Sequence, residues 1–326
     1  MTQDDLAYYI DGIRNKNRRI IAKAITLIES SLDTHQEKAR TIVEALLPYT
    51  GNSIRIGITG VPGVGKSTFI ESLGTYLIQQ NHQVAVLAVD PSSSRSGGSI
   101  LGDKTRMEKL SQSSAAFIRP SPSAGTLGGV AQKTRETILI CESAGYDVIL
   151  VETVGVGQSE VTVASMVDFF LVLMLPGAGD ELQGIKRGII ELADLVVVNK
   201  CDGDLVSKAE KAKQDYDTAL HLMGANESGW QPIVLTCSAT EITGIDKIWD
   251  TVMTHNQFAF KTGEFQYRRK KQAIEWMFSL LEQRLKERFY KNSTIQNRLP
   301  SIQHDVERGA RSVTSAVHEL LELMDQ

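Results

Sequence analysis

Short runs of apolar residues recur along the middle of this chain, and a longer stretch of mixed polar and apolar residues follows each run. Within a run the apolar positions are nearly continuous, which is typical of strands that are buried on both faces. We therefore predict an α/β fold, in which helices cover both faces of a mostly parallel sheet. The predicted strands span residues 54–59, 83–89, 115–118, 147–152, 169–175, 195–198 and 233–236.

The chain on either side of this region has helical patterns. An apolar face repeats at i, i+4 and i+8 within residues 20–28, which indicates a helix. Thr34 and Glu37 fit a capping box and predict the start of the next helix, which ends near residues 49–51. From about residue 258 onward the pattern predicts two long helices. We therefore expect a helical amino-terminal arm over 1–51, an α/β domain over 52–256 and a helical carboxyl-terminal region over 257–326.

A last apolar pattern lies near the carboxyl end of the chain. Its members are spaced alternately by four and three residues: Val306, Ala310, Val313, Val317, Leu320 and Met324. This is the heptad spacing of helices that pair along a seam, so the pattern predicts a dimer element. The alternative is that the same helix packs against its own domain.

Composition narrows the class of protein. Of the 326 residues 42% are hydrophobic, enough for a sizeable core, and the net charge of −4 predicts no nucleic-acid partner. The three cysteines are far apart and lack metal-ligand spacing, as in proteins of a reducing cytosol. Residues 1–10 show no signal or transit pattern, and the longest apolar run, 169–175, is too short to span a bilayer. We expect a cytoplasmic protein that is not bound to a membrane.

The first predicted strand runs directly into a glycine-rich segment. Its residues are Gly60, Val61, Pro62, Gly63, Val64, Gly65, Lys66, Ser67 and Thr68. They fit G-x-x-x-x-G-K-[ST], the phosphate-binding loop of nucleotide hydrolases. Glycines let backbone N–H groups curl around phosphates at the amino end of a helix, where negative charge is favoured. Lys66 would reach the β- and γ-phosphates, and the Ser67 hydroxyl would bind Mg²⁺.

A second motif predicts which base is bound. The strand at 195–198 is followed by Asn199, Lys200, Cys201 and Asp202, the N-K-x-D signature of guanine recognition. The Asp202 carboxylate can accept hydrogen bonds from both N1–H and the 2-amino group of guanine, a donor pair that adenine lacks. Asn199 and Lys200 would brace the loop. The strand at 233–236 leads to Ser238, Ala239 and Thr240, which resemble the segment whose backbone also meets guanine. We therefore expect GTP and GDP as ligands.

Carboxylates follow two other predicted strands. Asp90 comes directly after residues 83–89 and could bind Mg²⁺ through water. Glu152 ends the strand at 147–152, where many GTPases carry the aspartate of D-x-x-G, and Gly155 would then contact the γ-phosphate. Glu152 would be an outer Mg²⁺ ligand or a base that orients water. Asp103 is either a second carboxylate near Mg²⁺ or the N-cap of a helix.

The loop at 176–188 is rich in glycine and ends in two cations, Lys186 and Arg187. One interpretation is a solvated loop that opens a helix. The other is a switch that brings Lys186 or Arg187 toward the phosphates. Phosphoryl transfer often lacks one positive charge until a partner supplies it, and that charge is worth about 10³–10⁵ in rate.

Together these segments resemble the methylmalonyl-CoA mutase-associated GTPase family, over nearly the whole chain. The resemblance is most specific at residues 60–68, 88–94, 97–107, 151–160, 176–188 and 199–202. It implies a homodimer joined through carboxyl-terminal helices. It also implies a GTP-hydrolysing chaperone that binds an adenosylcobalamin-dependent mutase, gates loading of its cofactor, and protects or reactivates it. By the same resemblance Lys66, Asp90, Asp103 and Glu152 carry phosphate binding, Mg²⁺ binding and catalysis.

Two other functions use the same phosphate loop. A metal-delivery GTPase normally needs a site rich in cysteine and histidine, whereas the six histidines here are scattered and no cysteine adjoins one. A small-molecule kinase would make a phosphorylated acceptor, whereas a GTPase releases inorganic phosphate. The N-K-x-D motif argues against ATP, and product analysis separates the two activities.

Overall fold

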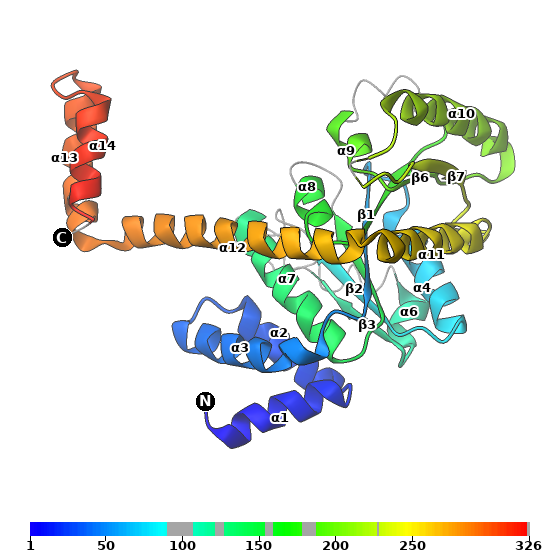
Figure 1. Ribbon diagram of the computed structural model, residues 1–326, viewed down its shortest axis with the longest axis horizontal. Helices are drawn as coiled ribbons and strands as arrows, with labels where there is room; N and C mark the ends of the chain where they lie inside the picture. Colours follow the sequence, from blue (N-terminus) through cyan, green and yellow to red (C-terminus); the bar gives the residue numbers. More distant parts are fainter. Residues whose placement is uncertain (90–106, 121–126, 154–158, 178–186, 227, 325–326) are drawn as a thin grey trace. The chain divides into compact units, whose positions relative to one another are not determined.

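The structure is a computed structural model that describes residues 1–89, 107–120, 127–153, 159–177, 187–226 and 228–324 (Figure 1). The chain divides into two compact units, Met1–Arg269 and Lys270–Gln326. None of the helices described is long and apolar enough to cross a membrane.

A seven-stranded parallel sheet forms the centre of the first unit. Its strands are β1 (Ile54–Gly60), β2 (Val84–Val89), β3 (Ala116–Arg119), β4 (Val148–Thr153), β5 (Phe169–Met174), β6 (Leu195–Val198) and β7 (Ile233–Thr236). Each lies within one residue of its predicted bounds, so the predicted strands are confirmed. The strand order is β3-β2-β4-β1-β5-β6-β7, and each neighbouring pair is parallel. The order reverses at β1, and in such sheets ligands bind beyond the carboxyl ends of the strands at that point.

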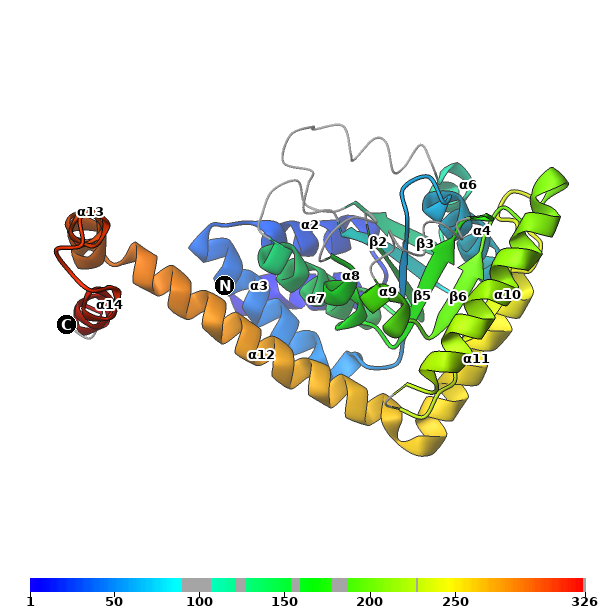
Figure 2. The same cartoon turned by 90° about the horizontal axis from the view of Figure 1, so that it is seen from above.

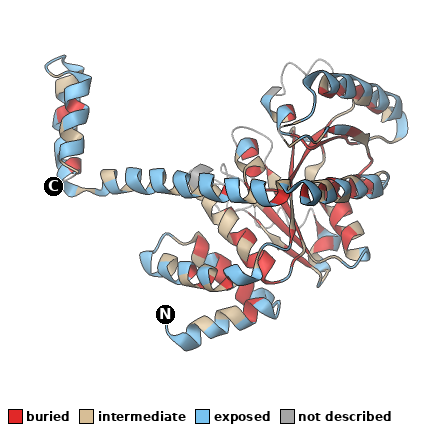
Figure 3. Ribbon diagram, viewed as in Figure 1, coloured by how far each residue is buried: buried red, intermediate tan, exposed pale blue. Residues whose placement is uncertain are grey.

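Helices cover both faces of the sheet, as the sequence predicts. They are α4 (Lys66–Gln79), α6 (Glu108–Gln112), α7 (Leu127–Ser143), α8 (Ser159–Ala164), α9 (Arg187–Glu191), α10 (Val206–Met223) and α11 (Ile245–Thr262). Buried side chains of α4, α6 and α11 share one core with the strands, and those of α7, α8 and α10 share the core of the opposite face. The inner strands are buried almost throughout (Figure 3), which explains why their sequences are continuously apolar, whereas the edge strands β3 and β7 are only partly buried.

The amino-terminal arm consists of α1 (Gln3–Arg14), α2 (Arg18–Glu29) and α3 (Asp33–Leu46), followed by a 3₁₀ turn η1 (Leu47–Tyr49). Both α2 and α3 lie beside α7 (Figures 1 and 2). The apolar face predicted on α2 is buried in the core that α7 shares with the sheet. Its members are Ile20, Ile21, Ala24, Ile25 and Ile28. The arm is therefore part of the same folded unit as the sheet.

The capping box predicted at Thr34 and Glu37 is wrong. Helix α3 begins two residues earlier than a capping box at Thr34 would place it, at Asp33, and its N-cap Leu32 offers no side-chain hydrogen bond. The hydroxyl of Ser30 orders the preceding turn instead, because it accepts a hydrogen bond from the Leu32 N–H at 3.3 Å. Thr34 is already inside the first helical turn, and Glu37 pairs with Arg40 at 2.6 Å.

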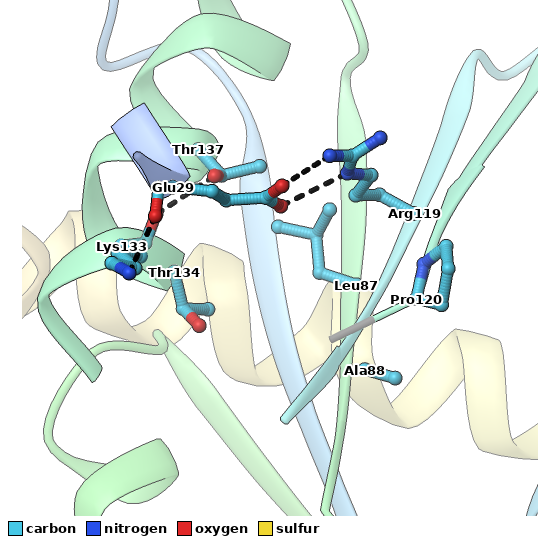
Figure 4. Close-up of a pocket in the computed structure, with 8 residues that line it drawn as sticks. All are labelled: Glu29, Leu87, Ala88, Arg119, Pro120, Lys133, Thr134 and Thr137. Atoms are coloured by element: carbon cyan, nitrogen blue, oxygen red, sulfur yellow. Dashed lines mark hydrogen bonds and ion pairs between the residues drawn. The ribbon is translucent and has the colours of Figure 1, made fainter. Parts of the chain in front are cut away.

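A charged clamp attaches the end of α2 to the carboxyl edge of the sheet (Figure 4). The Glu29 carboxylate accepts hydrogen bonds from two nitrogens of Arg119, at the end of β3, one of them the Nε at 3.0 Å. Lys133 of α7 donates to the backbone oxygen of Glu29 at 2.6 Å. These residues line a small pocket together with Leu87 and Ala88 of β2. The arm is thus tied to the end of β3 and to α7, beside the end of β2.

A buried carboxylate organises the opposite edge, where the strands begin. Glu142 of α7 accepts hydrogen bonds from Arg55 Nε at 2.9 Å and Nη2 at 3.0 Å. It also accepts from the Gly51 N–H at 3.0 Å and from the Ser53 hydroxyl, and Arg269 Nη1 lies 3.6 Å away. Burial by itself would raise the pKa of Glu142, but the guanidinium groups of Arg55 and Arg269 and the donated hydrogen bonds lower it. Glu142 therefore joins the segment after the arm, β1 and α7 through one negative charge.

The carboxyl-terminal part differs from the two long helices predicted after residue 258. Helix α11 continues to Thr262 and ends at Gly263, whose φ of 79° lies in the left-handed region that favours glycine. The helices that follow are α12 (Glu264–Lys291), α13 (Ser293–Glu307) and α14 (Val313–Glu322). Residues 308–312 form a turn between α13 and α14, so the heptad pattern starting at Val306 does not lie on one helix. The predicted single seam at 306–324 is therefore wrong.

Candidate nucleotide site

The glycine-rich loop lies between β1 and α4, at the carboxyl edge of the sheet. Gly60 ends β1, and a Cβ atom at this position would lie 2.5 Å from the backbone oxygen of Leu173 in β5. Gly65 is the N-cap of α4 with a φ of 95°, and its Cβ would lie 3.0 Å from the Asn199 side chain. Both close approaches require glycine. They place the loop directly against β5 and the segment after β6.

Lys66 folds back over this loop. Its ammonium group donates to the backbone oxygen of Gly60 at 2.8 Å and to that of Val61 at 3.4 Å. Burial lowers the pKa of Lys66, whereas the nearby carboxylates of Glu152 and Glu160 act to raise it. The Lys66 side chain is therefore bound to two carbonyl oxygens of the loop and is partly withdrawn from water.

Ser67 and Glu152 face each other beside the loop. The Ser67 hydroxyl donates to Glu152 Oε1 at 3.3 Å. Glu152 lies near the end of β4, in register with Ile58 of β1 and Ala88 of β2. A hydroxyl and a carboxylate are oxygen donors of the type that Mg²⁺ prefers, so these two residues fit the ion.

Four residues singled out from the sequence, Asp90, Asp103, Gly155 and Lys186, lie outside the described residues. The strand ends that precede them are described, and β2 and β4 are adjacent parallel strands. Their carboxyl ends therefore reach the same edge of the sheet as Glu152.

Asn199 connects the phosphate loop to the segment after β7. It is buried, and its Nδ2 donates to the backbone oxygen of Val64 at 2.8 Å. Its Oδ1 accepts from the backbone N–H of Ala239 at 3.1 Å and from the thiol of Cys237 at 3.4 Å. Burial raises the pKa of the Cys237 thiol to about 12, so this group is a neutral donor. The side chain of Asn199 thus bridges two loops that are far apart in the sequence.

Lys200 and Asp202 extend the same arrangement. Lys200 has a φ of 60°, and its ammonium group donates to the backbone oxygen of Gly63 at 2.8 Å. Asp202 Oδ2 accepts hydrogen bonds from the hydroxyl of Ser238 and from that of Thr240, the latter at 3.4 Å. The carboxylate is therefore oriented by two hydroxyls of the segment that follows β7.

Two contributors to this site were not predicted from the sequence. Cys237 donates to Asn199, and Ser72 of α4 donates to the backbone oxygen of Ala239 at 2.6 Å. The available signal for Ser72 was a polar residue on the apolar face formed by Phe69 and Leu73. For Cys237 there was none, because a buried cysteine is usual at the end of a strand.

Comparison with known proteins decides the family. A family model described as "Methylmalonyl Co-A mutase-associated GTPase MeaB" matches residues 21–294. The chain belongs to this family. GTPase ArgK of Escherichia coli (strain K12) is 49% identical over 88% of this chain and 87% of its own length. The mouse (Mus musculus) protein "Methylmalonic aciduria type A homolog, mitochondrial" is 45% identical over 95% of this chain and 77% of its own length.

A solved structure extends the likeness to the fold. The "Crystal structure of LAO/AO transport system kinase" matches with a TM-score of 0.80 and 39% identity, covering 100% of this chain and 99% of that one. The protein is therefore a P-loop GTPase that binds GTP and GDP, as predicted. The family description also names an association with methylmalonyl-CoA mutase.

Proposed function

We propose that this protein is a GTP-hydrolysing chaperone for an adenosylcobalamin-dependent acyl-CoA mutase, with methylmalonyl-CoA mutase as the first candidate client. In this proposal it gates loading of the cofactor and protects or reactivates the mutase. The family description and the name of the mouse relative support the client. The three scattered cysteines support a reducing compartment, and we propose the cytoplasm.

The roles of the site residues form part of the proposal. Residues 60–68 cradle the phosphates, and Lys66 exchanges its bonds to loop carbonyls for bonds to phosphate oxygens. Ser67 and Glu152 would hold Mg²⁺, together with Asp90 and Asp103. When bound, the ion would neutralise charge on the β- and γ-phosphate oxygens. Gly155 would contact the γ-phosphate, and Lys186 would supply the additional cation.

The observation that carries the nucleotide part is the bridge made by Asn199. One side chain bonds the backbone of the phosphate loop at Val64 and that of the base-recognition segment at Ala239. The segment that we propose for the phosphates and the segment that we propose for guanine therefore lie on opposite sides of one buried amide. Asp202 is oriented on the same segment by Ser238. This geometry suits a nucleotide that spans both loops.

Replacing Asp202 tests guanine recognition. Asp202→Asn offers an amide donor where xanthine carries a carbonyl, so we expect preference to shift from GTP to XTP in competition binding. Asp204→Asn is the matched control, because Asp204 is an exposed carboxylate two residues further on. Unchanged selectivity for GTP in the Asp202→Asn variant would show that Asp202 does not contact the base.

The client is tested with the mutase of the same organism. We expect the mutase to accelerate GTP hydrolysis, because an intrinsic rate without a fully placed cation falls to roughly 10⁻⁴–10⁻² per second. Phosphate release is measured with and without the mutase, and the products are analysed for inorganic phosphate. A mutase that neither binds nor changes the rate in either nucleotide state would exclude it as the client. A phosphorylated acceptor would instead indicate a kinase.

We also propose a homodimer, formed through the carboxyl-terminal region of residues 257–326. The support is an apolar stripe on α12, in the second unit, whose large side chains are about half exposed. They are Ile274 (54%), Phe278 (53%), Leu281 (51%) and Leu285 (47%). Their spacing of four, three and four residues is that of a heptad seam, and all four lie on the single helix α12. A second copy of α12 is the partner that such a self-complementary stripe fits.

Light scattering tests the seam on α12. Leu281→Glu places a charge in the stripe and should halve the measured mass. Lys286→Glu is the control, because it changes charge on the same helix outside the stripe, at an exposed position. A Leu281→Glu variant that stays dimeric would place the interface elsewhere.

A further inference from the structure

Ser72 departs from the usual behaviour of a buried hydroxyl on a helix. Thr134, Thr137 and Ser143 of α7 each donate to the backbone oxygen four residues earlier in their own helix. Ser72 lies on α4, six residues after Lys66, and donates instead to the backbone oxygen of Ala239 at 2.6 Å. It bridges two segments 167 residues apart, and its side chain is buried. The bond therefore links different parts of the fold.

Ala239 is constrained at both of its backbone polar groups. Its N–H donates to Asn199 Oδ1, and its oxygen accepts from Ser72. Asn199 in turn bonds the backbone of Val64, next to the start of α4. These contacts close a ring from α4 through Ala239 and Asn199 back to the phosphate loop. Two bonds therefore fix the distance between the phosphate loop and the segment 238–240. One is made by Asn199 and the other by Ser72.

We propose that Ser72 is a positioning residue for nucleotide binding, which sets the base-recognition segment 238–240 against the helix that begins at the phosphate loop. The inference rests on the nucleotide site proposed above. Without the hydroxyl the buried oxygen of Ala239 has lost its donor, and the segment relaxes toward water. The base contacts then weaken, whereas Lys66 and the residues around the γ-phosphate keep their places. Loss of the Ser72 hydroxyl should therefore shorten the time that a nucleotide stays bound, and it should not act on the chemical step.

Ser72→Ala should therefore speed the release of guanine nucleotides by a much larger factor than it alters the single-turnover rate of hydrolysis. We expect dissociation of fluorescent N-methylanthraniloyl-GDP, chased with unlabelled GDP, to become roughly tenfold faster, which corresponds to about 1.4 kcal/mol. The labelled non-hydrolysable GTP analogue should be affected by the same factor, because the bond lies on the base side. Single-turnover hydrolysis at saturating GTP should stay within about twofold of the wild type.

Ser143→Ala is the matched control. Ser143 is also a buried helical serine that bonds backbone oxygens, at 2.7 Å to Leu139 and at 3.3 Å to Leu46. We expect this variant to lose stability but to release GDP at the wild-type rate. Equal acceleration in both variants would mean that general loosening is the cause, and would overturn the proposal.

Two other results also overturn it. One is a Ser72→Ala variant that releases GDP at the wild-type rate. The other is a single-turnover rate that falls as far as the residence time does, because Ser72 would then act on the phosphate side. The Asp202→Asn experiment separates this inference from the proposed site. If Asp202→Asn shifts the base preference while Ser72→Ala has no effect, only the positioning role fails.

Discussion

Replacing Glu142 by glutamine should destabilise the first unit without affecting nucleotide chemistry. Glu142 lies at the edge of the sheet where the strands begin, and its side chain is only 1% exposed. Its carboxylate faces two guanidinium groups, a hydroxyl and a backbone N–H. Glutamine keeps the size of the side chain, but it removes the charge and turns an NH₂ group toward donors.

The size of the expected loss in unfolding free energy depends on the charges that stay buried after Glu142 is replaced. Arg55 and Arg269 are 15% and 14% exposed, so both cations stay largely buried without their shared counter-charge. Removing one partner from a buried ion pair destabilises by about 3–5 kcal/mol. Arg269 retains its bidentate bonds to Asp168, at 2.8 and 2.7 Å, which favours the lower end of that range. We therefore expect the free energy of unfolding to fall by about 3 kcal/mol.

The stability difference between the wild type and Glu142→Gln should decrease as the pH falls. The cations and hydrogen bonds lower the pKa of Glu142 in the folded protein below its ordinary value of 4.5, despite the opposing effect of burial. A carboxylate with a lowered folded pKa stabilises the protein above its unfolded pKa, and that stability is lost as the pH falls through the folded pKa. The difference between wild type and Glu142→Gln should thus be full at neutral pH and should shrink below about pH 4.5.

Urea unfolding measures the effect. A loss of about 3 kcal/mol shifts the midpoint by about 1 M at a slope of about 3 kcal/mol per M. Glu37→Gln is the control, because Glu37 and its partner Arg40 are both 65% exposed and their pair should contribute little. GTP hydrolysis below the transition should be unchanged, since Glu142 lies at the edge opposite the site. Equal midpoints for Glu142→Gln and Glu37→Gln would refute the reasoning.

Three further changes test the site itself. Lys66→Ala should abolish hydrolysis and weaken GTP far more than guanosine in binding assays, because the ammonium acts on phosphates; equal losses would indicate misfolding. Glu152→Gln should keep GTP binding but lose most single-turnover hydrolysis, and a wild-type rate would remove its role near the attacking water. Gly60→Ala should displace the loop, because its Cβ would lie 2.5 Å from the Leu173 oxygen, whereas a Cβ at Gly188 has no atom of the described residues within 4 Å. We expect Gly60→Ala, but not Gly188→Ala, to lose GTP binding in equilibrium titration.

Local sequence patterns determined the strands and the phosphate loop. A strand buried on both faces needs apolar residues at nearly every position, so its sequence reports its burial directly. The phosphate loop from Gly60 to Ser67 can likewise be predicted from the sequence, because consecutive residues form it. The order of segments was enough to predict an α/β GTPase before any contact was known.

Local patterns did not predict where helices begin and end, because neighbouring residues also determine these positions. Thr34 and Glu37 have the residue types of a capping box, but the helix begins at Asp33 because Ser30 orders the turn before it. The heptad from Val306 has the right spacing, yet the chain turns at 308–312. A spacing rule assumes a continuous helix, and it cannot report where that helix ends.

Only the tertiary structure decided which polar groups meet. Ser72 and Ala239 are 167 residues apart, and Asn199 and Val64 are 135 residues apart. Sequence separation carries no information on such pairs, because the strand order β3-β2-β4-β1-β5-β6-β7 sets which strand ends are adjacent. A buried hydroxyl or amide must find a partner, but its identity depends on the fold. The residue types of the site are therefore a property of the sequence, and the bonds that hold its two loops together are a property of the tertiary structure.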